Sequence, residues 1–121
     1  MKNMNNENKT FESIKHIDEN GIEYWYAREL QKVLKYNKWE NFEKVIQKAK
    51  IACENTGISV VEHFPDVRKT IRMPKNAEKE INDYKLTRYA CYLIAQNGDP
   101  RKEVKAIKQA GRNYARRITY T

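Results

Sequence analysis

The chain has 121 residues and a formal net charge of +8 at pH 7, from 24 basic and 16 acidic side chains. This length supports one hydrophobic core, and a hydrophobic content of 40% excludes a wholly disordered chain. No stretch approaches the roughly 18 consecutive apolar residues of a membrane span, and the first residues lack the apolar run of a secretory signal. We therefore expect a cytoplasmic protein whose excess positive charge favours a polyanionic partner, nucleic acid before an anionic membrane surface.

The chain begins with an Asn-rich stretch, residues 1–8, which we expect to be a disordered leader to a single domain over residues 9–121. Asn20-Gly21 follows between apolar and aromatic runs and is a strong hairpin signal, because both residues tolerate positive φ. Alternation in the returning strand predicts Trp25 on the opposite face from Tyr24. Trp25 is then the best exposed aromatic for stacking on nucleic-acid bases.

A period near 3.6 residues follows and predicts two helices, over residues 27–36 and 38–55. Asn37 and Glu40 have the form of a capping box for the second helix, and Gly57 is its natural C-terminal stop. Two helices joined by a short turn resemble modules that present one helix to a DNA groove. The cations of this pair that we expect to contact phosphates are Arg28, Lys32, Lys35 and Lys38.

The middle of the chain predicts extended structure. Residues 60–64 have the composition of a strand or extended segment that ends at Pro65. Residues 70–73 alternate up to Pro74, and residues 81–86 either return as the second strand of a hairpin or form the first turn of the next helix. We favour the strand, with Thr87 as the N-cap of the helix that follows.

Two helices are predicted at the C-terminal end. The first ends at Gly98, and Asp99-Pro100 opens the second, over about residues 99–118, since Asp is a good N-cap and Pro fits the first helical turn. At about 100° per residue, five cations of this helix share an arc of roughly 80°, away from its apolar seam. Such a stripe suits phosphate contact, although a solvated basic face remains the alternative. The stripe consists of Arg101, Lys105, Lys108, Arg112 and Arg116.

Cysteine, histidine and carboxylate patterns indicate no cofactor. Cys53 and Cys91 fall at apolar helical positions and are expected to be buried free thiols. No Cys/His cluster has the spacing of zinc ligands, so we expect no metal. Pro65-Asp66 and Asp83-Tyr84-Lys85 have the outline of a nuclease in which two carboxylates hold Mg²⁺ and the lysine polarises the phosphate. Short motifs of common residues arise often by chance, so a Mg²⁺-dependent nuclease is only a minor alternative.

Three longer runs resemble a known family. EYWYARELQKVL at residues 23–34, WENFEKVIQKAK at 39–50 and DYKLTRYACYLIAQNGDPRK at 83–102 are similar to the N-terminal region of the bacterial DNA-damage-inducible protein D family. More distantly, the arrangement resembles the BRO-type N-terminal domain of phage antirepressors. The resemblance covers about residues 9–105 and fades after Ala106, so it assigns no role to the basic stripe.

The resemblance implies an α+β module tied to DNA transactions. For the damage-inducible family it implies the SOS response and interference with recombinase filaments on single-stranded DNA. For the BRO-type relatives it implies DNA binding and transcriptional regulation. The resemblance implies no catalytic centre.

Together these patterns predict a small single α+β domain with two β-hairpin-like units, a helix-turn-helix-like pair and two C-terminal helices. We interpret it as a non-enzymatic, DNA-associated regulatory module that binds single- or double-stranded DNA. The alternative is a protein-interaction module that acts on a recombinase or a repressor, with the apolar seam of the last helix serving as a homodimer interface.

Overall fold

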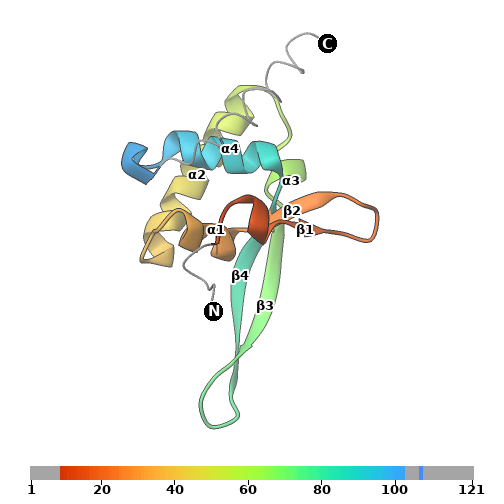
Figure 1. Ribbon diagram of the computed structural model, residues 1–121, viewed down its shortest axis with the longest axis vertical. Coiled ribbons are helices and arrows are strands. Elements are labelled where there is room, and N and C mark those ends of the chain that lie inside the picture. Colours follow the sequence, from red (N-terminus) through yellow and green to blue (C-terminus); the bar gives the residue numbers. More distant parts are fainter. Residues whose placement is uncertain (1–8, 103–106, 108–121) are drawn as a thin grey trace, which may run out of the picture.

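The computed structural model describes residues 9–102 and 107 (Figure 1). Within them an antiparallel four-stranded sheet has the order β1-β2-β4-β3 and carries helices α1, α2 and α4 beside it. The fold class is α+β, as predicted. The helices are α1 (Ala27–Val33), α2 (Trp39–Asn55), α3 (Val60–His63) and α4 (Arg88–Asn97). The strands are β1 (His16–Ile17), β2 (Glu23–Tyr26), β3 (Asp66–Arg72) and β4 (Glu78–Leu86), and short 3-10 turns occupy Glu12–Ile14 and Pro100–Lys102.

The first hairpin forms where Asn20-Gly21 predicts it. His16 pairs with Tyr24 across β1 and β2, and Gly21 takes the positive φ of the turn, +80°. The Asp18 carboxylate accepts hydrogen bonds from the N–H groups of Asn20 and Ile22, at 2.8 and 2.9 Å. These bonds satisfy turn amides that the strands leave without partners.

The helix pair is confirmed, but the predicted capping box is wrong. Lys38 is the N-cap residue of α2, and no side chain caps that end. At the other end, Gly57 at φ +79° ends the helix as predicted. The N–H of Ile58 donates to the carbonyl of Cys53 at 3.3 Å, as in a Schellman motif.

The expected extended segment over residues 60–64 is wrong, since Val60–His63 forms the short helix α3. The Ser59 hydroxyl accepts from the N–H of Glu62 at 3.3 Å and so caps this turn. His63 is buried, and its Nδ1 lies 2.6 Å from the hydroxyl of Thr87. The cap and the buried imidazole outweigh the β preference of two valines.

The second hairpin and the helix after it are confirmed. β3 and β4 pair without interruption from Asp66↔Tyr84 to Arg72↔Glu78. Thr87 is the N-cap of α4, and its hydroxyl accepts from the N–H of Ala90 at 3.1 Å. The strand is therefore the correct alternative for residues 81–86.

Trp25 is part of the core, so its predicted exposure is wrong. Its side chain is 0% exposed and stacks on Phe11, with ring centroids 4.4 Å apart and an interplanar angle of 2°. Its indole N–H donates to the carbonyl of Phe11 at 2.8 Å. Trp25 pairs with buried Leu86 across β2 and β4, so alternation puts Tyr24 and Tyr26 on the opposite face of the sheet.

The two cysteines are free and buried, as predicted. Burial raises the pKa of both thiols, Cys53 and Cys91, which favours their protonated form. They contribute to the core as small apolar side chains.

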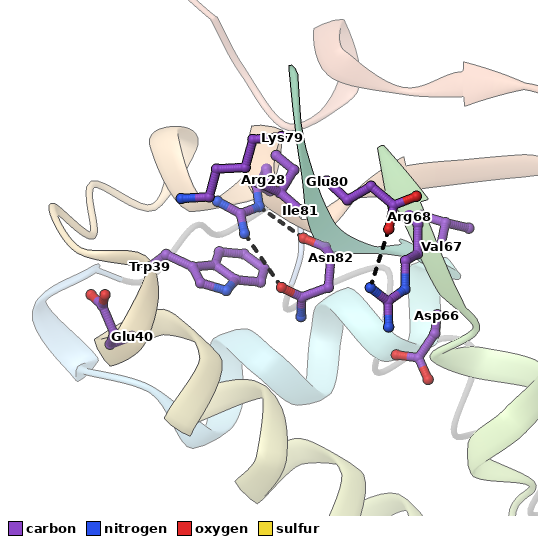
Figure 2. A pocket seen from close by; sticks show the side chains of 10 residues that line it. All are labelled: Arg28, Trp39, Glu40, Asp66, Val67, Arg68, Lys79, Glu80, Ile81 and Asn82. Atoms are coloured by element: carbon purple, nitrogen blue, oxygen red, sulfur yellow. Dashed lines mark hydrogen bonds and ion pairs between the residues drawn. The ribbon is translucent and has the colours of Figure 1, made fainter. Parts of the chain in front are cut away.

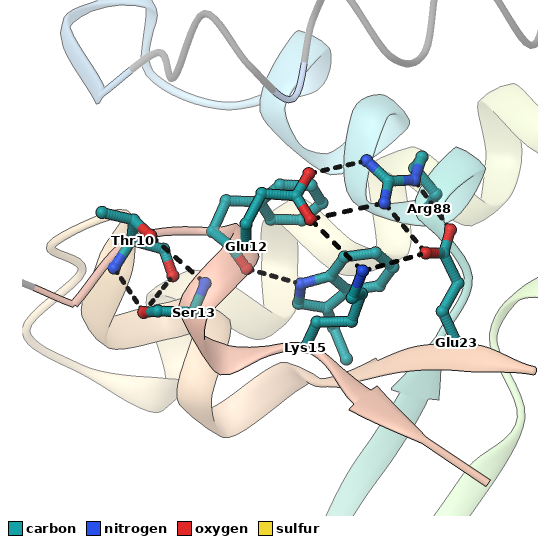
Figure 3. Close-up of polar contacts among 8 residues, drawn as sticks. Thr10, Glu12, Ser13, Lys15, Glu23 and Arg88 are labelled. Carbon is teal, nitrogen blue, oxygen red and sulfur yellow. Dashed lines mark hydrogen bonds and ion pairs between the residues drawn. The ribbon is translucent and has the colours of Figure 1, made fainter.

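Arg88 joins the N-terminal segment to the sheet and to α4 (Figure 3). Its guanidinium donates to Glu23 at 2.7 and 2.9 Å and to Glu12 at 2.9 Å. Nζ of Lys15 lies 3.7 Å from Oε1 of Glu12 and 3.8 Å from Oε1 of Glu23. The hydrogen bonds from Arg88 lower the pKa of both carboxyls below the usual value of 4.5.

This network predicts a stability that depends on pH. A carboxyl whose pKa is lowered on folding stabilises the folded state, and this stability is fully present above the pKa of the unfolded chain, near 4.5. It is lost as the pH falls through the lowered pKa of the folded state. The variant Arg88→Met removes the cation that lowers both values. We expect its unfolding free energy to fall less steeply on acidification than that of the wild type. Urea titrations at several pH values from neutral to below the lowered values measure the two slopes.

Arg101→Met is the matched control, because Arg101 pairs with Asp99 and is 88% exposed. Its pH slope should match that of the wild type. Equal slopes in Arg88→Met and the wild type would contradict the role given to Arg88.

The C-terminal end is described only in part. The Asp99 carboxylate accepts from the N–H of Arg101 at 3.0 Å, and Ile107 is fully buried. The remainder of the predicted helix 99–118 and the predicted leader 1–8 lie outside the described residues. Across the part that is described, no helix is long and apolar enough to cross a membrane.

Candidate nucleic-acid interface

The structure describes one side chain of the predicted basic stripe. Arg101 lies in the 3-10 turn Pro100–Lys102, where its guanidinium donates to the Asp99 carboxylate at 2.9 and 3.1 Å. Lys105, Lys108, Arg112 and Arg116 lie outside the described residues. Their place on one helical face stays a prediction.

Arg28 is the first member of the second predicted group of cations, on the helix pair. Its guanidinium lies 4.0 Å from the ring centroid of Trp39 and donates through Nε to the carbonyl of Asn82 at 2.9 Å. The side chain thus joins the start of α2 to β4. Lys32, Lys35 and Lys38 lie on α1 and its connection to α2, where all three are exposed to solvent.

A pocket of about 690 Å³ opens beside Arg28, between the starts of α1 and α2 and the paired strands β3 and β4 (Figure 2). Its lining holds three basic side chains, Arg28, Arg68 and Lys79, and three acidic ones. These charges balance, so the pocket by itself does not attract a polyanion. The buried indole N–H of Trp39, which also lines it, has no hydrogen-bond partner among the described residues.

Asp83 is a fully buried carboxylate beside this pocket. Its Oδ1 accepts from the N–H of Arg28 at 3.0 Å and from the N–H of Tyr84 at 2.8 Å. Arg28 is the second residue of α1, whose own N-cap, Tyr26, makes no side-chain cap. Oδ2 lies 2.8 Å from Nζ of Lys69. A carboxylate from β4 therefore caps α1, where the helix dipole favours negative charge.

This position of Asp83 opposes the nuclease alternative. Asp66 pairs with Tyr84, whereas Asp83 pairs with Val67, so the two carboxylates point to opposite faces of the sheet. They do not form a pair that holds one metal ion. Among residues 9–102 and 107, no group of three or more His, Cys, Asp or Glu is arranged to bind a metal ion.

The face of the sheet away from Trp25 combines aromatic and basic side chains. Nζ of Lys69 lies 3.4 Å from the ring centroid of Tyr26, and Nζ of Lys85 lies 4.9 Å from that of Tyr24. His16 stacks on Tyr24, with centroids 5.3 Å apart. We call this surface the tyrosine–lysine face. By pairing and alternation it contains His16, Tyr24, Tyr26, Val67, Lys69, Ile71, Lys79, Ile81, Asp83 and Lys85.

Charge is divided unequally between the two faces of the sheet. Within the four described strands, buried Asp83, neutralised by Lys69, is the only carboxylate on the tyrosine–lysine face. Glu23, Asp66, Glu78 and Glu80 all fall on the other face. The tyrosine–lysine face is therefore the one that the sheet offers to an anion.

Residue pairing across strands far apart in sequence creates this face, so the spacing of residues along the chain does not reveal it. Tyr26 and Lys85 are partners in β2 and β4 although three helices separate them along the chain. One local signal exists within the second hairpin. Its strands place Ile71 opposite Lys79 and Lys69 opposite Ile81, which are no more than twelve residues apart in the sequence.

Comparison with known proteins identifies the domain. A model of the BRO family, N-terminal domain, matches residues 13–110. The chain belongs to this family. The BRO match includes the tyrosine–lysine face, the pocket, Lys105 and Lys108, while Arg112 and Arg116 lie beyond it.

A curated relative confirms the resemblance to the damage-inducible family. This BRO-family chain is 44% identical over 106 residues to DNA damage-inducible protein D of Escherichia coli (strain K12). The alignment covers 88% of the chain and 39% of the relative, so the chain spans about two fifths of the length of that protein. No solved structure matches the chain significantly.

Proposed function

We propose that this domain is a non-enzymatic DNA-binding module that regulates a step of the response to DNA damage. The name of the relative and membership of the BRO family support the biological setting. The observation that carries DNA binding is the tyrosine–lysine face, where Lys79 and Lys85 make no ion pair with a described residue and Lys85 lies beside the Tyr24 ring. The strand carboxylates other than Asp83, which Lys69 neutralises, fall on the opposite face of the sheet. Phosphates are the ligands for such cations, and ring faces add contacts with bases or sugars.

DNA binding by this module should depend steeply on salt. Each lysine or arginine that contacts a phosphate releases condensed cations, so log K falls against log salt with a slope of about −0.9 per contact on duplex DNA. With four contacts the affinity falls by roughly two orders of magnitude between about 50 and 200 mM salt. Fluorescence anisotropy with a labelled duplex and its single strand measures both slopes. An affinity that does not respond to salt, or no binding at either concentration, would refute the proposal.

Charge reversal locates the contacts within the module. Changing Arg101, Lys105, Lys108 and Arg112 to Glu tests the predicted stripe. Changing Lys32, Lys35 and Lys38 to Glu tests the group on α1 and its connection to α2. A group that binds phosphates lowers the affinity when it is reversed, and the salt slope falls by about 1 for each phosphate that the variant no longer binds. A group whose reversal leaves the slope unchanged does not belong to the interface.

A further inference from the structure

The hairpin of β3 and β4 extends well beyond the body of the domain (Figure 1). We call residues Thr70–Glu80 the β-arm. Nearly all of its residues are exposed, in contrast to the base of the same hairpin, where Asp83, Tyr84 and Leu86 are buried. The arm is therefore held at its base and surrounded by solvent at its end.

The end of the β-arm is a defined turn. Lys75 and Asn76 have φ of +64° and +61°, and the N–H of Ala77 donates to the carbonyl of Pro74 at 3.4 Å. Positive φ at both central residues is the pattern of a type I′ turn, whose twist matches that of the paired strands. The N–H of Met73 also donates to the carbonyl of Ala77, at 2.9 Å, so the ladder continues to the turn.

The β-arm contains three cations, exposed apolar groups and two carboxylates, and the carboxylates, Glu78 and Glu80, lie on the face away from Ile71 and Lys79. Arg72, Lys75 and Lys79 make no ion pair with any described residue. Ile71 and Met73 are each 38% exposed, and alternation places both on the tyrosine–lysine face, beside Lys79. The exposed part of these two side chains, about two fifths of each, adds nothing to the stability of an isolated two-stranded arm.

The β-arm has the dimensions of a groove-binding element. At about 3.4 Å per residue, the three steps from Thr70 to Met73 span about 10 Å. The major groove of B-DNA is about 8.5 Å deep and about 12 Å wide and admits a two-stranded β-ribbon, whereas the minor groove is only about 6 Å wide.

We propose that the β-arm enters the major groove of duplex DNA, an inference that rests on the DNA-binding function proposed above. Arg72, Lys75 and Lys79 contact the phosphates that line the groove. Ile71 and Met73 meet the base edges, where the methyl group of thymine offers an apolar contact. The tyrosine–lysine face continues from the arm to the body and lies over the adjoining backbone.

Two double variants with the same change in charge test the contacts of the arm. Lys75→Gln/Lys79→Gln removes two arm cations, and Lys44→Gln/Lys48→Gln removes two cations of α2. On a duplex of about 25 base pairs, the arm variant should bind about tenfold more weakly, with a salt slope lower by about 2. The α2 variant should keep the wild-type slope.

A shortened arm tests the apolar end and the groove. Replacing residues 72–78 with Asn-Gly joins the paired residues Ile71 and Lys79 through a two-residue turn and leaves the base of the hairpin intact. This variant should lose the wild-type preference for duplex over single-stranded DNA. Methyl green, a major-groove ligand, should displace the wild type, whereas netropsin, a minor-groove ligand, should not.

The outcomes separate the two proposals. If the wild type binds DNA and both arm variants bind equally well, the arm inference fails and the DNA-binding function stands. If netropsin displaces the protein and methyl green does not, the assigned groove is wrong. If the wild type binds neither duplex nor single strand, both proposals fail.

Discussion

Replacing Asp83 with Ala is expected to lower the free energy of unfolding by about 3 kcal/mol. The change removes the acceptor of the Arg28 and Tyr84 amides and the partner of Lys69 at once. A buried amide left without a partner costs about 1–3 kcal/mol. Lys69 is 33% exposed and regains water, so its share of the loss is small. Urea unfolding followed by far-UV circular dichroism gives the value.

Asp66→Ala is the matched control for this change. Asp66 belongs to the neighbouring strand, is exposed and makes no ion pair with a described residue, so its replacement should change stability by no more than about 0.5 kcal/mol. Asp83→Asn keeps one oxygen that can accept from the two amides. Its loss of unfolding free energy should therefore lie between those of Asp66→Ala and Asp83→Ala. Equal losses for Asp66→Ala and Asp83→Ala would show that the buried carboxylate does not cap α1.

Replacing Trp25 with Ala should cost about 3–5 kcal/mol, the largest loss expected for a single change in this domain. Trp25 is 0% exposed, and its removal leaves a large cavity. It also removes the ring stack on Phe11 and the donor to the Phe11 carbonyl. The N-terminal segment that carries Phe11 then loses both its ring stack on β2 and its hydrogen bond to β2.

Trp25→Phe separates the ring from the hydrogen bond. It keeps an aromatic stack and loses the indole N–H, so we expect a loss of about 1–2 kcal/mol. The same urea titrations measure it. A loss as large as that of Trp25→Ala would mean that the hydrogen bond, not the buried ring, anchors the segment.

Much of the fold is predictable because its signals are local. Gly21 and Gly57 mark a turn and a helix end through positive φ, which few other residues adopt without cost. Thr87 marks the start of α4 through its hydroxyl. Each of these signals acts within four residues, so the sequence alone carries it.

The errors arise where long-range contacts decide the outcome. Alternation correctly separates Trp25 from Tyr24, but only the pairing of Trp25 with Leu86 shows which side faces the core. Val60–His63 is a helix partly because His63 bonds to Thr87, which is distant in sequence. The side chain that caps α1 is Asp83 in β4, so no sequence motif near α1 predicts this cap.

The candidate interface is predictable only in part for the same reason. Sequence spacing selects Arg28, Lys32, Lys35 and Lys38 because they lie close together in the sequence, on α1 and its connection to α2. It does not select Lys69 or Lys85, whose significance comes from lying over Tyr26 and Tyr24. A sheet face is assembled from several strands, and its composition depends on their order.

The strand order β1-β2-β4-β3 has a consequence for how the chain folds. β1–β2, β3–β4 and the helix pair each join near neighbours and can form early. Pairing of Trp25 with Leu86 instead closes a loop of about sixty residues, whose entropy must be lost before the contact is gained. We therefore expect this pairing to be a late, rate-limiting event, with substitutions in the β2–β4 ladder slowing refolding more than substitutions at the end of the β-arm.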